Sequence, residues 1–178
     1  MGLQSADNEE LKCLGRIHTY EDFRQVYQWA REAGFTNINV DLMSALPGQT
    51  RKSWQETLQK VLVLNPEHIS AYSLIIEEGT PFFDEYGETD CAQKKKKDAA
   101  KLLPSEDEVV QMDELTWKLL GEAGYEHYEI SNYALPESVC RHNLKYWHCE
   151  EYLGVGTGAA SYMKTNSSGD YCRLKVIT

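Results

Sequence analysis

The chain has 178 residues, of which 42% are hydrophobic and 26% are charged. Such a composition supports a packed core and excludes intrinsic disorder, and no apolar run approaches the roughly 20 residues that a membrane span needs. A net charge of −10 argues against a nucleic-acid-binding surface, which requires clustered lysine and arginine. We interpret the one basic run, Lys94 to Lys97, as a solvated loop because it follows an acidic stretch.

The cysteines argue against a disulfide framework, because their number is odd and the polar, acidic start of the chain carries no export signal. A reducing cytoplasm fits this pattern better. The sequence contains neither CxxC nor CxxxCxxC, and its five cysteines are Cys13, Cys91, Cys140, Cys149 and Cys172. A zinc site made of Cys140, His142, His148 and Cys149 is the weaker interpretation, because the adjacent His–Cys pair suits tetrahedral closure poorly.

Helix and strand patterns alternate over the first half of the chain. Thr19 with Asp22 resembles a capping box, and Gly34 suits the position after a last helical turn. Thr50 can begin a later helix that Pro66 ends. We therefore expect a strand end at residues 2–5, a short helix at 9–14, helices at 20–33 and 50–65, and strands at 37–43 and 69–76. This order predicts an α/β fold with a parallel sheet and covering helices.

The strand at residues 37–43 favours a barrel over an open doubly wound sheet. Strands of an open sheet are usually apolar on both sides, because helices cover both faces. Here Ile38, Val40 and Leu42 share one face, while the other face carries Asn39 and Asp41 together with Met43. One polar face suits a barrel lumen or a cleft.

The second half of the chain changes character. Residues 77–104 are expected to form a loop, and Ser105 with Glu108 forms a second capping box for a helix that ends near Gly121. Aromatic and β-rich segments follow, and we expect an antiparallel addition from about residue 125. Its predicted strands cover residues 125–130, 152–163 and 171–177.

Several motifs permit both a functional and a plain structural interpretation. Asp41, expected near the carboxyl end of its strand, could accept ribose hydroxyls or pair with a neighbouring cation or amide. Arg16 could bind a carboxylate or lie at the surface, and Gln4 alone indicates nothing. The glycines of Gly154-x-Gly156-x-Gly158 have the wrong spacing for a nucleotide loop and favour close backbone packing. The segment His142 to Trp147 could contact a metal or porphyrin, or anchor a loop with its aromatic side chains.

Six separated motifs resemble one family in its own order. They are Asn37-Ile-Asn-Val-Asp-Leu-Met-Ser-Ala-Leu-Pro-Gly-Gln-Thr50, His68-Ile-Ser-Ala-Tyr-Ser73, Glu78-Gly-Thr-Pro-Phe82, Tyr128-Glu-Ile-Ser-Asn-Tyr-Ala134, His142-Asn-x-x-Tyr-Trp147 and Tyr152-Leu-Gly-Val-Gly156. The chain is similar to the radical S-adenosylmethionine (SAM) family of oxygen-independent coproporphyrinogen III oxidases and HemW-type heme chaperones. The resemblance implies the second half of an incomplete (β/α)6 barrel over residues 1–104. It also implies the start of a C-terminal domain over residues 105–178.

The resemblance also implies roles for single residues. Gln4 and Asp41 would contact the SAM ribose, and Arg16 would contact the methionine carboxylate. His142 would be an axial heme ligand, in a possible heme-binding motif with Asn143, Tyr146 and Trp147. The family's [4Fe–4S] cluster is held by a CxxxCxxC loop that this sequence lacks, so we expect a fragment that is inactive alone.

Two functions follow as expectations. The first is a fragment of a cytoplasmic heme chaperone or coproporphyrinogen oxidase-like protein that binds SAM and heme, with porphyrin or a heme-accepting protein as partner. In the complete protein, cluster-bound SAM would yield a 5′-deoxyadenosyl radical. The alternative is a non-catalytic module that binds heme or a partner without SAM.

Overall fold

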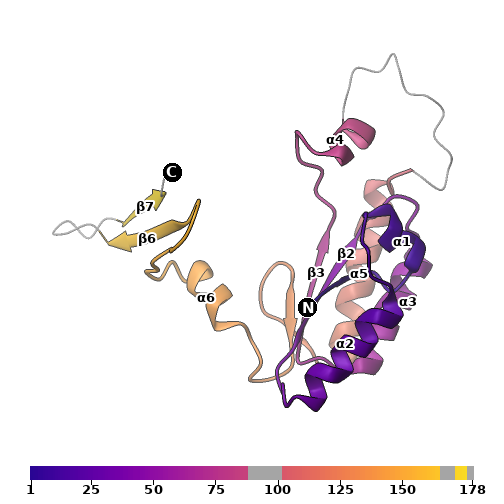
Figure 1. Ribbon diagram of the computed structural model, residues 1–178, viewed down its shortest axis with the longest axis horizontal. Helices are drawn as coiled ribbons and strands as arrows, with labels where there is room; N and C mark the ends of the chain where they lie inside the picture. Colours follow the sequence, from indigo (N-terminus) through magenta and orange to yellow (C-terminus); the bar gives the residue numbers. More distant parts are fainter. Residues whose placement is uncertain (88–101, 165–170, 176–178) are drawn as a thin grey trace. The chain divides into compact units, whose positions relative to one another are not determined.

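The computed structural model describes residues 1–87, 102–164 and 171–175, which fall into two compact units, Met1–Val139 and Cys140–Thr178 (Figure 1). Cys91 and the run Lys94 to Lys97 lie outside the described residues. The first unit contains β1 (Gly2–Gln4), α1 (Asn8–Cys13), α2 (Tyr20–Glu32), β2 (Asn39–Ser44), α3 (Arg51–Leu64), β3 (His68–Ser73), α4 (Pro81–Tyr86), α5 (Glu106–Glu122), β4 (Glu126–His127) and β5 (Asn132–Ala134). The second contains α6 (Arg141–Trp147), β6 (Ala160–Lys164) and β7 (Tyr171–Lys175).

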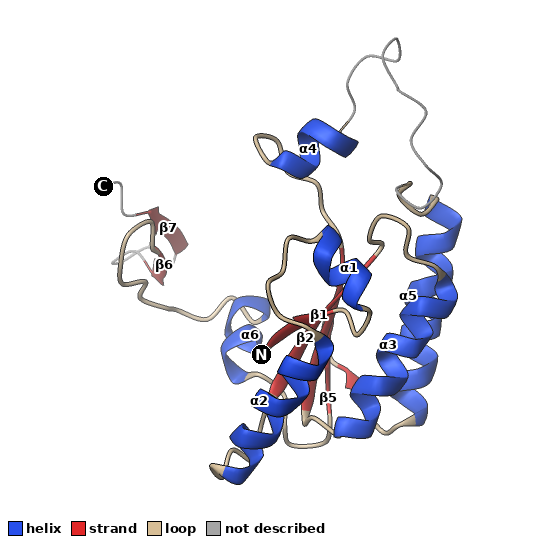
Figure 2. Cartoon of the chain, turned by 45° about the vertical axis from the view of Figure 1, so that its right-hand side comes forward, coloured by secondary structure: helices blue, strands red, loops and turns tan. Residues whose placement is uncertain are grey.

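The first unit is built on a five-stranded sheet in the order β1-β2-β3-β5-β4. Strands β1, β2 and β3 are parallel, whereas β5 runs antiparallel to β3 and β4 antiparallel to β5. Helices α2, α3 and α5 lie along one side of β2 and β3 (Figures 1 and 2). The predicted α/β class, its parallel sheet and its antiparallel addition are thus confirmed. The compact unit continues past residues 104 and 105, because β5 pairs with β3 and α5 packs on α3.

Local capping explains where the three long helices begin. The hydroxyl groups of Thr19, Thr50 and Ser105 each accept a hydrogen bond from the backbone amide three residues later. The side chain at that third position accepts a hydrogen bond from the backbone amide of the capping residue. Each helix start therefore pairs amides that the helix itself leaves unpaired. Helix α3 ends at Asn65, whose left-handed backbone (φ 51°) closes the last turn before Pro66.

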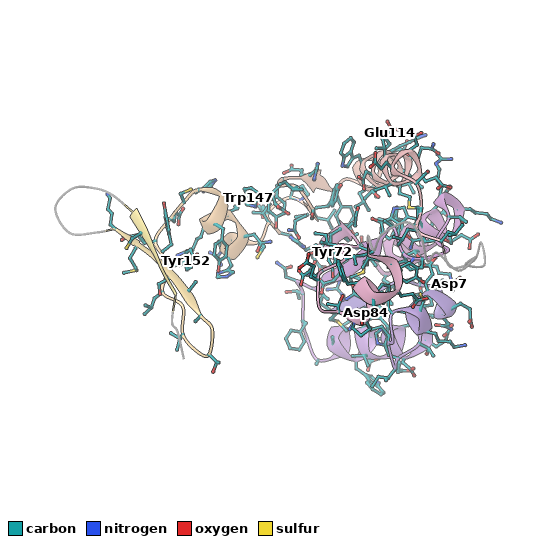
Figure 3. All side chains as sticks on the ribbon, turned by 90° about the horizontal axis from the view of Figure 1, so that it is seen from above. Asp7, Tyr72, Asp84, Glu114, Trp147 and Tyr152 are labelled. Atoms are coloured by element: carbon teal, nitrogen blue, oxygen red, sulfur yellow. The ribbon has the colours of Figure 1, made fainter. Side chains whose placement is uncertain are left out.

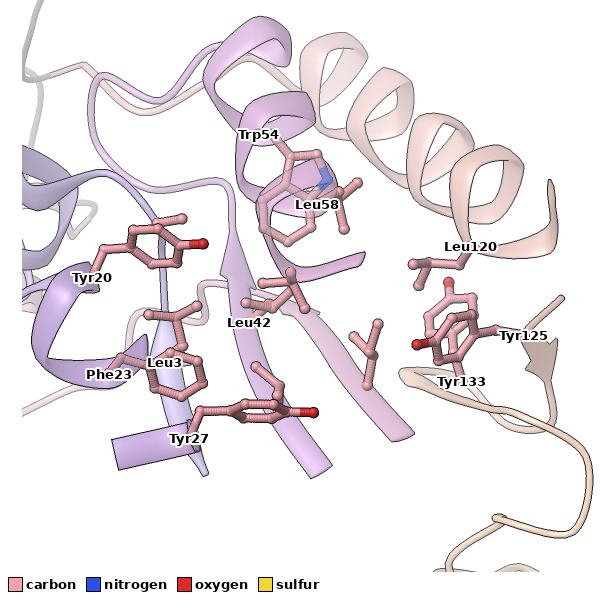
Figure 4. Packing of buried hydrophobic residues seen from close by; sticks show 14 of the residues in the cluster. Leu3, Tyr20, Phe23, Tyr27, Leu42, Trp54, Leu58, Leu120, Tyr125 and Tyr133 are labelled. Atoms are coloured by element: carbon pink, nitrogen blue, oxygen red, sulfur yellow. The ribbon is translucent and has the colours of Figure 1, made fainter. Parts of the chain in front are cut away.

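The hydrophobic core lies between the sheet and its helices (Figure 4). Val40, Leu42 and Ile69 are fully buried on the helix-facing side of β2 and β3, as the alternation in residues 37–43 predicted. They meet Trp54 and Leu58 from α3, which are also fully buried. Helix α2 adds its aromatic side chains Tyr20, Phe23 and Tyr27.

The prediction that residues 77–104 form a loop is wrong at Pro81–Tyr86, which form the helix α4. Thr80 caps this helix and Pro81 occupies its first turn, where a missing amide hydrogen costs nothing. The predicted strand at residues 125–130 is shorter in the structure, where β4 covers only Glu126–His127.

The single strand expected over residues 152–163 is also wrong, because a glycine turn interrupts it. Tyr152 forms only an isolated bridge with Tyr162, and the strand β6 begins at Ala160. Gly156 and Gly158 take positive φ values of 114° and 72°, which suit a turn. A Cβ atom at Gly154 would lie 2.3 Å from the carbonyl oxygen of Ala160, so the expected close backbone packing is confirmed there.

None of the helices in the described parts of the chain is both long and apolar enough to cross a membrane.

Candidate functional site

Gln4 ends β1 and turns its side chain over the sheet. Its backbone is left-handed (φ 72°), and its side chain is almost fully buried, at 7% exposed. The hydroxyl of Tyr72 donates a 3.0 Å hydrogen bond to Gln4 Oε1. A Cβ atom at Gly2 would lie 2.9 Å from Gln4 Nε2 and 4.0 Å from Asp41 Oδ2, so the amide and the carboxylate both flank this glycine.

Asp41 lies on the polar face of β2, opposite the core. Asn39 Nδ2 donates a 2.7 Å hydrogen bond to Asp41 Oδ1, while Asp41 Oδ2 lies 3.9 Å from the Met1 amine. The prediction that Asp41 lies near the carboxyl end of its strand is wrong. Asp41 is the third of six residues in β2, because pairing with β3 extends the strand to Ser44 opposite Ser73.

Tyr72, labelled in Figure 3, is the side chain whose hydroxyl is influenced by all three predicted residues. Burial raises the pKa of Tyr72, and the negative charge of Asp41 raises it further. The hydrogen bond with Gln4 and the positive charge of Arg16 act in the opposite direction on the same hydroxyl. Gln4 thus contacts the Tyr72 phenol directly, whereas Asp41 and Arg16 act on it through their charges. Arg16 itself is exposed in the loop after α1.

The same face of the sheet carries a second polar group, centred on a buried histidine. His68 is 4% exposed and begins β3 opposite Asn39. Its Nδ1 lies 2.7 Å from Asn39 Oδ1, and its Nε2 lies 2.7 Å from the hydroxyl of Tyr128. Burial lowers the pKa of His68, and the carboxylates of Asp41 and Glu129 oppose this only in part.

A buried carboxylate accepts a hydrogen bond from Ser5, the residue that follows Gln4. Glu10 on α1 is 7% exposed and has no lysine or arginine partner among the ion pairs of the described residues. Instead it accepts hydrogen bonds from Ser5 (2.6 Å), Gln49 (2.9 Å) and Ser53 (2.8 Å). These donors come from the end of β1, the loop after β2 and the start of α3. Glu10 therefore ties together the segments that follow Gln4 and Asp41.

Sequence reasoning missed Tyr72, His68 and Glu10. The polar alternation that identified Asp41 also runs through β3, where His68, Ser70 and Tyr72 pair with Asn39, Asp41 and Met43. Aligning the two strands would have placed Tyr72 and His68 on the polar face. Nothing in the local sequence distinguishes Glu10 from an ordinary acidic residue in the first turn of a helix.

The second unit presents its candidate residues on α6. The rings of His142 and Tyr146 contact edge to face, and Tyr146 Oη lies 3.1 Å from His142 Nε2. Tyr146 contacts Tyr152, which stacks on Tyr162, and these tyrosines line a cavity of about 290 Å³. Asn143 is half-buried, and Trp147 is 52% exposed and labelled in Figure 3.

The described residues contain no cluster of three or more His, Cys, Asp or Glu side chains placed to hold a metal ion. His148, at the C-terminal end of α6, lies beside a carboxylate: its Nδ1 is 3.6 Å from Glu150 Oε1. An iron–sulfur cluster therefore has no ligand set among these residues.

Residues 1–61 match the family model of the Radical SAM superfamily. The matched segment contains Gln4, Arg16 and Asp41 and runs from β1 into α3. This segment of the chain is therefore similar to radical SAM proteins.

Within the superfamily the chain is HemW- and HemN-like. It is 38% identical over 163 residues to "Heme chaperone HemW" of Lactococcus lactis, covering 92% of this chain and 40% of that protein. It is 36% identical over 160 residues to the zebrafish (Danio rerio) "Radical S-adenosyl methionine domain-containing protein 1, mitochondrial", covering 89% of this chain and 34% of that protein.

A solved structure supports the same relationship. The Escherichia coli coproporphyrinogen III oxidase HemN, described as a radical SAM enzyme, matches 90% of this chain with a TM-score of 0.68 and 26% identity. The match covers 37% of HemN. The mixed α/β sheet is consistent with part of a radical SAM barrel, as the polar face of β2 predicted. The chain spans 40% of the L. lactis relative and a similar share of HemN.

Proposed function

We propose that this chain is the SAM-binding part of a HemW- or HemN-like protein of porphyrin metabolism. The observation that carries the proposal is that Gln4 and Asp41 flank Gly2, that Gln4 accepts a hydrogen bond from Tyr72, and that the charges of Asp41 and Arg16 act on that same hydroxyl. Gln4, Arg16 and Asp41 all lie in the segment that matches the superfamily. These residues come from β1, β2 and the loop after α1, so the fold rather than the sequence order assembles them.

The chemistry of the group suits SAM. A carboxylate accepts hydrogen bonds from ribose hydroxyls, and Asp41 Oδ2 lies on the side away from Asn39's donor. The amide of Gln4 supplies a neighbouring donor. The guanidinium of Arg16 offers a planar fork for the methionine carboxylate.

The cluster chemistry of the family is not assigned to this chain. The sequence lacks CxxxCxxC, and its described residues contain no cluster of three or more His, Cys, Asp or Glu side chains placed to hold a metal ion. In the family's complete proteins the cluster supplies the electron that cleaves SAM. The proposal for this chain is therefore limited to binding, and a cytoplasmic location is proposed with it.

Changing Asp41 to asparagine is expected to weaken SAM binding by about tenfold or more, since a charge-assisted acceptor is replaced by a neutral amide. The measurement is isothermal titration of the 178-residue chain with SAM. Glu114→Gln is the matched control, because Glu114 is an exposed carboxylate on α5 (Figure 3) and its loss is expected to leave the affinity unchanged. Equal affinities of Asp41→Asn and the unaltered chain would contradict the proposed site.

We also propose that α6 binds heme and that a heme-accepting protein is a further partner. The support is an exposed histidine, His142, whose Nε2 lies 3.1 Å from the hydroxyl of Tyr146, on the same helix as the exposed indole of Trp147. His142 would be the axial ligand, and Asn143, Tyr146 and Trp147 would contact the porphyrin. The relatives named heme chaperones favour this assignment over a catalytic one.

His142→Ala is expected to reduce the Soret shift on heme titration, because an alanine cannot coordinate iron. His148→Ala is the matched control, since His148 is exposed at the C-terminal end of the same helix. An unchanged Soret band in His142→Ala would exclude His142 as the ligand. Heme binding by a chain that does not bind SAM would favour the alternative, a heme-binding module without SAM chemistry.

A further inference from the structure

Three hydrogen bonds connect Tyr128, through a buried histidine, to the proposed ribose-binding carboxylate. They run from Tyr128 Oη to His68 Nε2, from His68 Nδ1 to Asn39 Oδ1, and from Asn39 Nδ2 to Asp41 Oδ1. Each measures 2.7 Å. The parallel register that places Asn39 opposite His68 makes the chain of contacts possible.

The direction of each bond follows from what its partners can donate. A carboxylate only accepts, so Asn39 presents its NH₂ group to Asp41 and its oxygen to His68. His68 must then donate from Nδ1. Its Nε2 is left as the acceptor for the hydroxyl of Tyr128, which defines the neutral Nδ1–H tautomer.

A neighbouring serine does not replace this donor. Ser70 Oγ lies 3.1 Å from Asn39 Oδ1 but only 2.6 Å from Asn132 Oδ1, and a hydroxyl has a single hydrogen to give. The shorter contact takes that hydrogen. His68 is therefore the principal donor that holds the amide of Asn39 in its orientation.

The surroundings of His68 favour the neutral ring. Burial lowers its pKa, as described above, and the ring lies edge to face against Tyr128 with centroids 5.6 Å apart. The packing leaves the imidazole little freedom to turn over. Its two nitrogens therefore keep distinct roles.

We propose that His68 is a positioning residue for SAM. It holds the amide of Asn39 so that Asn39 donates its hydrogen bond to Oδ1 of Asp41, and Oδ2 is left for a ribose hydroxyl. This inference rests on the proposed SAM site and adds to it a residue that touches no ligand. It explains why a histidine begins a strand whose other face is buried in the core.

Two substitutions separate this role from simple packing. The side-chain nitrogen of asparagine can occupy the place of Nδ1, whereas that of glutamine corresponds to Nε2. We therefore expect His68→Asn to bind SAM within about threefold of the unaltered chain, and His68→Gln to bind about tenfold more weakly. Thermal unfolding of both variants shows whether either has lost the fold. If the two folded variants bind SAM equally, the positioning role is overturned.

A measurement without SAM tests the tautomer itself. Long-range ¹H–¹⁵N spectra of the histidines, with the His68 signals assigned by their loss in His68→Asn, should show a protonated Nδ1 and a bare Nε2. Tyr128→Phe should leave Nδ1 protonated, because Asn39 Oδ1 still takes the hydrogen of that nitrogen. A ring protonated at Nε2 in the unaltered chain would overturn the inference whatever SAM does. If Asp41→Asn weakens SAM binding and His68→Gln does not, the inference fails and the proposed function stands.

Discussion

Replacing Trp54 with alanine is expected to lower the free energy of unfolding of the first unit by about 3–5 kcal/mol. Trp54 is fully buried between α3, α5 and the sheet, and its Nε1 donates a 2.9 Å hydrogen bond to Thr116 Oγ1. The change removes the largest fully buried side chain of the core and leaves a cavity that rigid neighbours fill poorly. Because folded domains are stable by about 5–15 kcal/mol, the loss is a large part of the total.

Urea denaturation followed by circular dichroism measures this effect. Trp54→Phe is the matched control, since it keeps most of the buried volume and loses only the indole hydrogen bond. We expect it to cost about 1–2 kcal/mol. If alanine at position 54 cost no more than phenylalanine, the packing of α3 against α5 described here would be wrong.

Glu10→Ala is expected to lower the free energy of unfolding by roughly 3 kcal/mol. The substitution leaves Ser5, Gln49 and Ser53 without the acceptor that they share, in a place that water reaches poorly. It also releases the segment that directly follows Gln4. The loss of stability should therefore be accompanied by weaker SAM binding.

The same denaturation experiment includes two controls for Glu10. Glu10→Gln keeps one acceptor oxygen and should lie between alanine and the unaltered chain. Glu9→Gln removes an exposed carboxylate that pairs with Lys12 at the surface, and it should change stability little. Equal stability of Glu9→Gln and Glu10→Ala would show that the buried contacts of Glu10 contribute nothing.

Local patterns made the helices and the first strands predictable. Thr19, Thr50 and Ser105 each cap a helix where the sequence indicated one, because capping depends on residues only three positions apart. The alternation of Val40 and Leu42 with polar neighbours gave the two faces of β2 for the same reason. Such signals are contained in a short window of sequence.

Contacts between distant segments were not predictable in this way. Tyr72 meets Gln4 only through a sheet that brings together residues 68 positions apart, and Glu10 meets Ser53 across 43 positions. No local pattern sets these distances. Gln4 and Arg16 were identified through the family resemblance, since neither residue is informative alone. The interruption at Gly156 was overlooked because aromatic and β-branched neighbours outweighed the glycines.

At Gln4 an unfavourable backbone conformation accompanies a side-chain contact with Tyr72. An L-residue in a left-handed conformation costs roughly 1–2 kcal/mol, and glycine at this position would avoid that penalty. Glycine would, however, have no side-chain oxygen to accept the hydrogen bond that the Tyr72 hydroxyl donates. Selection for greater thermal stability would therefore favour glycine at position 4. The same change would remove the Gln4 side chain from the proposed SAM site.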